Sequence, residues 1–435
     1  MRISRFITTF GLTAGLGLSV VSTPATAQFL PGLPTIPGTG VRYGCDWGVV
    51  NDVNTNNTGF LDTTATYATA VLPVNPGNGA VITITGTYPR VRYFSFQLYS
   101  GFRPGNFVDT APDSEIIPIG GVAPGSNPAA LPPNNNYTNR YQVTIRFEDA
   151  PVPPAVRAPN TIYAGTSGSA GAVTKQLTYR TYLPNVGSDG LGGQPLPTLR
   201  YVGPDGQFDL ADAPDQRGCQ LSTNLTNALV LFPVAGVGQG QSNVAFRPIS
   251  GRGAGVFYPN GDSDYLRAQT GSIYAPLIVI RARLPTTPHL PLANPDVRYY
   301  SLCQNQLNNS RNVGCIADRE FTLQNDGTFT AVISSEANRP VLAYPQFGYN
   351  WLPFGPATFG LTVLRQILSR PTFEGNFQNA VDNPDAPLTE TLGSFAPDIT
   401  YCDRATFTAF APSGGAALIA ACRANFRPIG GLLGN

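Results

Sequence analysis

The chain has 435 residues, of which only 12% are charged, and its 27 basic and 26 acidic side chains nearly cancel. This balance excludes a strongly cationic protein of the kind that binds nucleic acid or an anionic membrane through charge alone. An apolar content of 42% with 24 Phe and 19 Tyr excludes a disordered chain, whereas 47 Gly and 41 Pro favour many short strands joined by turns.

The N-terminus has the organisation of a secretory signal peptide. Arg2 and Arg5 precede an apolar stretch without acids at 6–21, and a small-x-small triplet follows at 25–27. We expect cleavage after Ala27, which removes both arginines and leaves 25 basic residues against 26 acidic ones. Because no later apolar run is long enough for a transmembrane helix, the sequence predicts a protein that is secreted, periplasmic or on the cell surface.

An internal duplication is the most informative pattern in the rest of the chain. The heptapeptide PRVRYFS at 89–95 recurs as PDVRYYS at 295–301. Further segments correspond in the same order: 60–62 with 258–260, 80–85 with 277–280, 141–147 with 329–333, and 177–180 with 361–365. We therefore expect two diverged copies of one β module.

Several of these segments alternate apolar and polar residues, as half-buried strands do, and Asp326-Gly327 predicts a hairpin turn. We expect a mainly β protein of two tandem β-sandwich or jelly-roll-like modules. One short C-terminal helix is expected at 416–425, with Ser413 as its N-cap. The predicted organisation is a signal peptide at 1–27, a Pro/Gly-rich tether at 28–44, the two modules at 45–219 and 220–400, and a disulfide-pinned C-terminal segment at 401–435.

Six cysteines lie beyond the predicted cleavage site: Cys45, Cys219, Cys303, Cys315, Cys402 and Cys422. In an oxidising compartment we expect them to form disulfides. Proximity favours the pairs 303–315 and 402–422, which leaves 45 with 219. A metal-thiolate site is the weaker alternative, because the chain has no Cys-x-x-Cys motif and a single histidine, His289.

Scattered blocks of the chain resemble a bacterial domain family of unknown function. Residues 350–356, NWLPFGP, and 361–365, LTVLR, resemble its N-W-L-P-x-P and L-x-L-R patterns. Residues 92–99, RYFSFQLY, are similar to its R-[FY]-W-S-L-x-x-Y strand, although Phe94 stands where the family usually has tryptophan, and 326–330, DGTFT, resembles its D-G-S-L-T hairpin. The resemblance implies a β-sandwich fold, no established activity and no catalytic residues.

Candidates for catalytic chemistry are few. A Ser-His-Asp triad would have to use His289, and the chain has no Gly-x-Ser-x-Gly motif. Glu115, Glu148 and Glu320 are candidate carboxylates for glycoside hydrolysis, which needs two of them close in space, but nothing in their spacing pairs them.

One segment suggests a metal site. Asn260, Asp262 and Asp264 alternate oxygen donors as calcium loops do, but the downstream glycine and glutamate are absent. Ordinary Asx turns are the favoured interpretation. We expect neither a metal nor another cofactor.

The repeated arginines and tyrosines are the remaining candidates. Arg92 and Arg298 begin equivalent strands on the face of the large apolar residues, where a guanidinium needs a carboxylate or carbonyl partner. Structural pinning is the favoured interpretation, and an anion-holding pocket is the alternative. Tyr93, Tyr99 and Tyr299 are predicted on the opposite strand faces, where exposed rings would stack on sugars, and burial between packed sheets is the alternative.

These patterns favour an exported binding or cell-surface component without enzymatic activity. The expected partner is a polysaccharide or another component of the cell envelope, and no nucleic acid is expected. Two alternatives remain: a secreted carbohydrate-active hydrolase with an unassigned carboxylate site, and a purely structural envelope protein.

Overall fold

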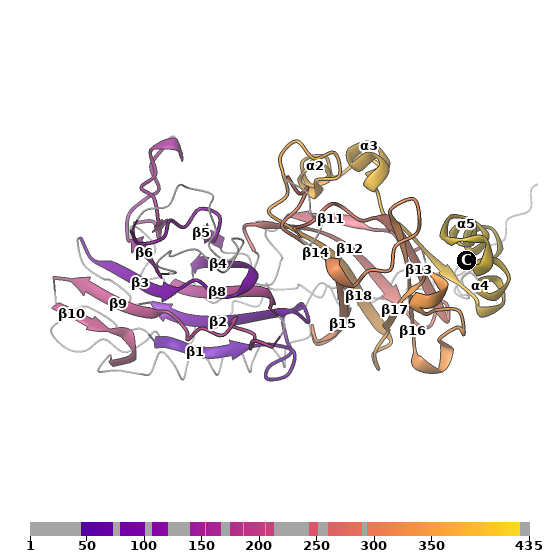
Figure 1. Cartoon of the computed structure of the whole chain (residues 1–435), viewed down its shortest axis with the longest axis horizontal. Helices are drawn as coiled ribbons and strands as arrows, with labels where there is room; N and C mark the ends of the chain where they lie inside the picture. The colour runs from indigo at the N-terminus through magenta and orange to yellow at the C-terminus, as the bar shows by residue number, and fades with distance from the viewer. Residues whose placement is uncertain are drawn as a thin grey trace, which may run out of the picture. The chain divides into compact units, whose positions relative to one another are not determined.

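The computed structural model describes residues 45–72, 79–100, 107–120, 140–152, 154–166, 175–185, 187–204, 206–212, 243–250, 260–288 and 294–426 (Figure 1). The predicted signal peptide, the tether at 28–44, Cys219 and His289 lie outside the described residues. Expectations about these parts of the chain stay predictions.

The first repeat contains two five-stranded sheets within the described residues. One has the order β1-β2-β8-β4-β5, with β1 at Cys45–Asn51, β2 at Ala65–Leu72, β8 at Lys175–Pro184, β4 at Val91–Ser100 and β5 at Phe107–Pro112. The other has the order β10-β9-β3-β6-β7, with β10 at Gly206–Asp209, β9 at Thr198–Gly203, β3 at Val81–Thr87, β6 at Arg140–Arg146 and β7 at Thr161–Tyr163. Neighbouring strands are antiparallel except β6 and β7, which are parallel.

The second repeat has the same arrangement, except that β10 has no counterpart among the described residues. One sheet has the order β11-β12-β18-β14-β15, with β11 at Arg247–Ser250, β12 at Ser263–Gly271, β18 at Phe359–Ile367, β14 at Tyr299–Gln306 and β15 at Asn312–Ala317. The other has the order β17-β16-β13-β19, with β17 at Asn350–Pro353, β16 at Thr328–Ser334, β13 at Leu277–Arg283 and β19 at Asp398–Cys402. Here the parallel pair is β16 and β17.

The strand orders confirm the predicted duplication. The repeated heptapeptides begin or lead into β4 and β14, which pair with the equivalent central strands β8 and β18. The two modules also share an unusual backbone conformation. Leu183 and Leu368, at the ends of β8 and β18, have φ values of 51° and 48°, a region that non-glycine residues rarely adopt. The fold is therefore mainly β, with two tandem β-sandwich-like modules.

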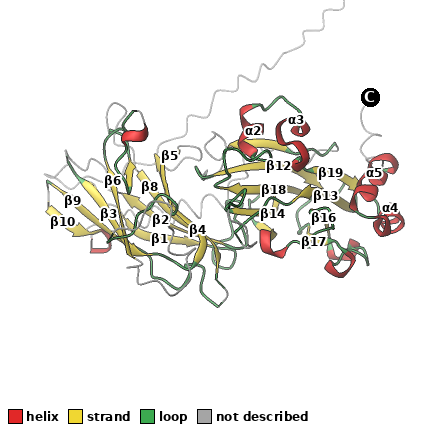
Figure 2. Ribbon diagram, turned by 45° about the horizontal axis from the view of Figure 1, so that its top comes forward, coloured by secondary structure: helices red, strands yellow, loops and turns green. Residues whose placement is uncertain are grey.

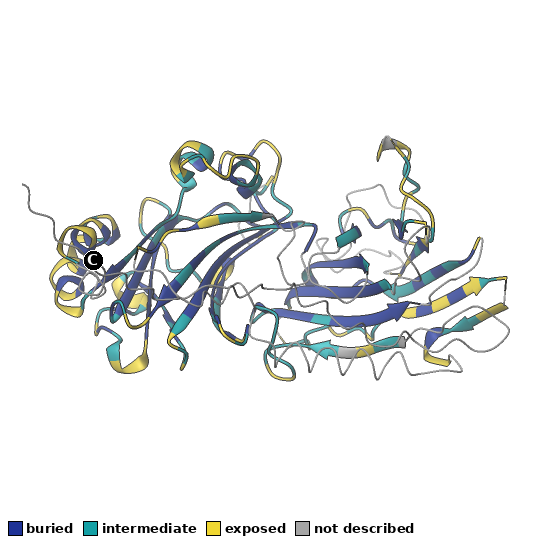
Figure 3. Cartoon of the chain, turned by 180° about the vertical axis from the view of Figure 1, so that it is seen from behind, coloured by how far each residue is buried: buried dark blue, intermediate teal, exposed yellow. Residues whose placement is uncertain are grey.

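Each module buries its apolar core between its two sheets, as the alternation of side chains predicts (Figure 3). In the first module Phe94 and Phe96 of β4 pack with Val143 and Ile145 of β6, and all four side chains are fully buried. Burial of side chains of this size stabilises a fold by about 1.5–3 kcal/mol each. The second module has an equivalent core between its own two sheets.

The described helices lie in the second half of the chain, apart from short 3-10 turns (Figure 2). They are α2 at Phe377–Asp382, α3 at Leu388–Leu392, α4 at Arg404–Phe410 and α5 at Gly415–Asn425. The 3-10 turns are at Pro154–Val156, Leu210–Asp212, Asp318–Glu320, Glu336–Asn338, Pro345–Phe347, Gly393–Phe395 and Ala411–Ser413.

Helix α5 confirms the predicted C-terminal helix, but its predicted N-cap was wrong. The N-cap is Gly414, not Ser413, because Ser413 belongs to a preceding 3-10 turn. Three further helices were missed. Of these, α4 begins at Asp403, whose carboxylate accepts the backbone N–H of Thr406 at 2.7 Å, the usual N-cap interaction.

Two disulfides confirm the predicted neighbouring pairs. Cys303 and Cys315 face each other on β14 and β15, with 4.1 Å between their Cα atoms. Cys402 at the end of β19 is bonded to Cys422 of α5, which fixes the helix to the sheet. No described helix is long and apolar enough to cross a membrane.

Candidate functional site

Two equivalent polar loops, one in each module, form the contact between the modules. Each loop makes hydrogen bonds to strands of the other module. The first loop precedes β2 and carries Asp62, and the second precedes β12 and carries Asn260. The backbone carbonyl of Asp62 accepts the N–H of Ala65, and that of Asn260 accepts the N–H of Ser263. The two residues therefore occupy equivalent positions, as the sequence comparison indicates.

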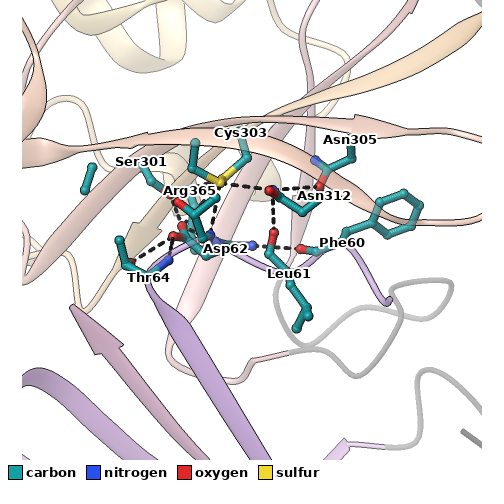
Figure 4. The surroundings of a disulfide bond; sticks show 12 residues. Phe60, Leu61, Asp62, Thr64, Ser301, Cys303, Asn305, Asn312 and Arg365 are labelled. Atoms are coloured by element: carbon teal, nitrogen blue, oxygen red, sulfur yellow. Dashed lines mark hydrogen bonds and ion pairs between the residues drawn. A yellow bond between two sulfur atoms is a disulfide. The ribbon is translucent and has the colours of Figure 1, made fainter. Parts of the chain in front are cut away.

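Asp62 is fully buried, and its carboxylate is surrounded by donors (Figure 4). From its own loop it accepts the N–H and hydroxyl of Thr64 at 3.0 and 2.9 Å. From the other module it accepts the hydroxyls of Tyr299 and Ser301 at 3.0 and 2.6 Å, and a guanidinium N–H of Arg365 at 2.6 Å. The loop is thus held to β14 and β18 by charge-assisted hydrogen bonds.

The Arg365 guanidinium is itself buried and enclosed by aromatic rings. It lies 5.6 Å from the ring centre of Tyr182, in the first module, and 5.5 Å from that of Tyr265, in the second. Breaking a buried ion pair by removing one partner usually costs about 3–5 kcal/mol, because the remaining charge is uncompensated. Removing either Asp62 or Arg365 alone should therefore destabilise the contact between the modules by about this amount.

The Cys303–Cys315 disulfide lies against the same loop. Its Cys303 sulfur is 3.5 Å from an Asp62 carboxylate oxygen, and the Asn312 amide donates to the Leu61 carbonyl at 2.8 Å. Asp62 and the two cysteines would form a cluster of metal-ligand types. Because the sulfurs are bonded to each other, they offer no thiolate to a metal.

The second loop repeats the arrangement in the opposite direction. The Asp262 carboxylate accepts the hydroxyl of Tyr93 at 2.6 Å, the amide of Gln97 at 2.8 Å and the hydroxyl of Thr110 at 3.1 Å. The Gly261 N–H donates to the Gln97 side chain at 3.0 Å. Burial and the adjacent Asp262 raise the pKa of Tyr93 well above its ordinary value, so Tyr93 remains neutral and donates.

Two reciprocal ion pairs complete the contact. Arg92 of β4 pairs with Asp318 at 3.0 Å, and Arg298, next to β14, pairs with Asp113 at 2.8 Å. In the strand registers Ser95 faces Pro112 and Ser301 faces Ala317, so the two aspartates occupy equivalent positions. Each arginine therefore pairs with an aspartate of the other module. The two ion pairs are equivalent under the internal duplication.

This geometry assigns Arg92 and Arg298 a structural contact. Their carboxylate partners are fully buried, so these two arginines do not form an open pocket for an external anion. The Arg298 guanidinium also donates to the backbone carbonyl of Arg92 at 2.8 Å. The interpretation as structural arginines fits these contacts, and their partner is the other module.

The hypothesis of an exposed aromatic platform was wrong for Tyr93, Tyr99 and Tyr299. The exposed fraction of each side chain is 0–1%. Tyr93 and Tyr299 are covered because the opposite module places its loop on them, and the Tyr99 hydroxyl accepts an N–H of Arg180 at 2.7 Å. These rings cannot stack on a sugar while the modules remain in contact.

The calcium candidate Asn260, Asp262 and Asp264 is not arranged around an ion. The side-chain carbonyl of Asn260 accepts the N–H of Asp262 at 3.0 Å, which is the expected Asx turn. The donors Tyr93 and Gln97 occupy the oxygens of Asn260 and Asp262, while Asp264 lies within β12. The segment therefore serves the contact between modules.

A cavity in the second module is the candidate binding site. Its volume is about 390 Å³, and its walls come from β13, β16, the start of β19, the α3 region and α5. The lining residues are Arg281, Ala282, Arg283, Thr328, Pro387, Leu388, Thr389, Ser394, Ala396, Pro397, Asp398 and Arg423. This volume lies in the range of ligand pockets, about 300–1,000 Å³.

Sequence reasoning missed this cavity, although β13 carries a signal. Leu277 and Val279 face the apolar cluster that α4 and α5 cover. The same strand face continues with Arg281 and Arg283. The change from apolar to cationic residues along this face of β13 marks the point where α4 and α5 no longer cover the strand.

No known protein family and no curated protein matches the chain. Among solved structures, an uncharacterized protein from Burkholderia cenocepacia is similar at 13% identity and a TM-score of 0.45, over 79% of this chain and 78% of that one. The VPA0106 protein from Vibrio parahaemolyticus is similar at 11% identity and a TM-score of 0.37, over 78% of this chain and 89% of that one. The family resemblance of the NWLPFGP segment stays a prediction.

Proposed function

We propose that this protein is an exported binding component of the cell envelope or cell surface, without enzymatic activity. The observation that carries the proposal is the arginine-lined cavity of about 390 Å³ on a disulfide-pinned β module. A cavity of this size lined by a few polar groups suits a small ligand or one unit of a polymer.

Export is supported by the predicted signal peptide and by the disulfides. Disulfides persist in oxidising compartments outside the cytoplasm, where a small number of them can stabilise a protein exposed to a variable medium. The Cys402–Cys422 bond fixes α5, and α5 supplies Arg423 to the cavity wall. The oxidised state therefore supports the binding site directly.

The contact between the modules supports a rigid scaffold. Its buried polar groups are arranged as paired donors and acceptors, from Asp62 in one loop to Asp262 in the other. Such networks cost free energy when they are broken, which favours keeping this contact intact. A binding protein benefits because a pre-organised site loses less entropy when its ligand binds.

The test is retention of the oxidised mature chain, from Gln28, on a panel of polysaccharides and intact cell envelopes, with reduced and denatured protein as the control. Saturable retention that requires the fold supports the proposal. Release of reducing sugar that is abolished by an acidic-residue substitution would support a hydrolase instead. Incorporation into an assembled surface layer without ligand retention would support a structural envelope protein.

A further inference from the structure

We propose that the cavity of the second module binds an oxyanion, a carboxylate or phosphate group, carried on a ligand the size of one or two sugars. This inference rests on the proposed binding function and names the chemistry that the site recognises. It concerns Arg281, Arg283 and Arg423, which approach the cavity from two elements, β13 and α5.

The charges around the cavity are unequal. Three guanidinium groups line it, against one lining carboxylate, Asp398, which pairs with Arg423. Arg281 pairs at 2.6 Å with Asp326 in the adjacent hairpin turn. Within the described residues Arg283 has no ion pair of its own. Hydrogen bonds within the hairpin lower the pKa of the Asp326 carboxyl, and both Arg281 and Arg283 lower it further. The three lining arginines therefore exceed the two nearby aspartates by one positive charge.

The chemistry of arginine favours an oxyanion over a halide. A guanidinium presents parallel N–H donors that match the two oxygens of a carboxylate or phosphate. The hydroxyl-bearing residues Thr389 and Ser394 and the apolar Pro387 and Leu388 complete the walls. Hydroxyl donors and apolar surface together suit a sugar ring that carries the anionic group.

The experiment is isothermal titration calorimetry of the oxidised mature protein with digalacturonate, glucose 6-phosphate and neutral cellobiose. We expect at least one anionic probe to bind at least about tenfold more tightly than cellobiose, and to weaken as salt is raised. Tighter binding of digalacturonate would assign a carboxylated sugar, and tighter binding of glucose 6-phosphate a phosphorylated one.

The decisive variant is Arg283→Gln, which removes the unpaired charge and should weaken anion binding at least about tenfold. Arg146→Gln is the matched control, because Arg146 lies on β6 of the first module and its side chain is 48% exposed beside Glu148. If Arg283→Gln lowers the unfolding midpoint, Arg423→Gln on the exposed part of α5 decides instead.

The outcomes separate this inference from the proposed function. Equal affinity for charged and neutral probes, no binding of either anion, or unchanged anion affinity in both cavity variants would overturn the inference. Retention on polysaccharide that survives Arg283→Gln would leave the binding function intact and place it elsewhere. Anion binding without retention on any envelope material would support the cavity and count against the proposed envelope role.

Discussion

Replacing Asp62 with asparagine should destabilise the protein more than almost any other isosteric change. The substitution keeps the size of the side chain but removes the counter-charge of the buried Arg365, a loss of about 3–5 kcal/mol. The new amide NH₂ must also face donors, because both carboxylate oxygens accept hydrogen bonds from Thr64, Tyr299 or Ser301. The measurement is a urea unfolding curve of the oxidised protein.

The control is Asp209→Asn, since Asp209 pairs with Arg200 on the exposed surface, where such pairs are worth less than about 1 kcal/mol. Combining Asp62→Asn with Arg365→Met should recover part of the loss, because the double variant no longer buries an unpaired charge. Equal midpoints for Asp62→Asn and Asp209→Asn would refute the importance of this contact.

Three further predictions concern the contact between the modules and the C-terminal disulfide. Burial raises the pKa of the Asp113 carboxyl to about 6 despite Arg298, so the stabilisation that this one group contributes should be complete below about pH 4 and fall by on the order of 3 kcal/mol as the pH rises through 6. Asp113→Asn should remove this component from the pH dependence of the urea midpoint. Gly261→Ala should cost about 1–3 kcal/mol in thermal unfolding, because the new methyl group overlaps the Phe107 ring. Removing the 402–422 disulfide by double alanine substitution should cost about 3 kcal/mol, measured by urea unfolding in oxidising buffer.

Each of these has a result that contradicts it. The Asp113 prediction is contradicted if Asp113→Asn leaves the pH dependence of the urea midpoint unchanged. For Gly261 the control is Gly314→Ala, whose methyl group would meet Leu352 at an ordinary 3.4 Å, and equal losses in both variants would reject the overlap. For the disulfide it is an unfolding midpoint equal to that of the wild type.

Local patterns were enough to predict the fold. Alternation of apolar residues located strands such as β6, and the repeated heptapeptide revealed the duplication because it lies in the strands that pair with the centre of each sheet. Short separations of 12 and 20 residues made the two neighbouring disulfides the simplest pairing. All of these features depend on residues that are close in sequence or repeated in it.

The contact between the modules was beyond those patterns. Asp62 meets Arg365 across 303 positions, and a polar strand face looks the same in sequence whether water or another module covers it. Tyr93 and Tyr299 were assigned to an exposed platform for that reason. One signal was available in the sequence. Asp113 and Asp318 are repeated between the two modules just as Arg92 and Arg298 are, and a repeated set of opposite charges suggests ion pairs between the modules.

The cavity was missed because part of its wall, the α3 region, was left without structure by sequence reasoning, and the strands and helix that complete it are far apart in the chain. Helices α2, α3 and α4 are short, and their caps, such as Asn376, stand among turn-forming residues. Packing against the sheet stabilises them, since helices of this length are marginal alone. The Arg281 and Arg283 pair was visible as an alternation, but the space in front of it depends on tertiary structure.

The most direct test compares the oxidised wild type and Arg283→Gln side by side for retention on intact cell envelopes, with Arg146→Gln as the control. We expect saturable retention of the wild type and the control, and loss of the Arg283→Gln variant to the flow-through at the same protein concentration. Equal retention of all three proteins, or retention of none, would contradict a binding function centred on this cavity.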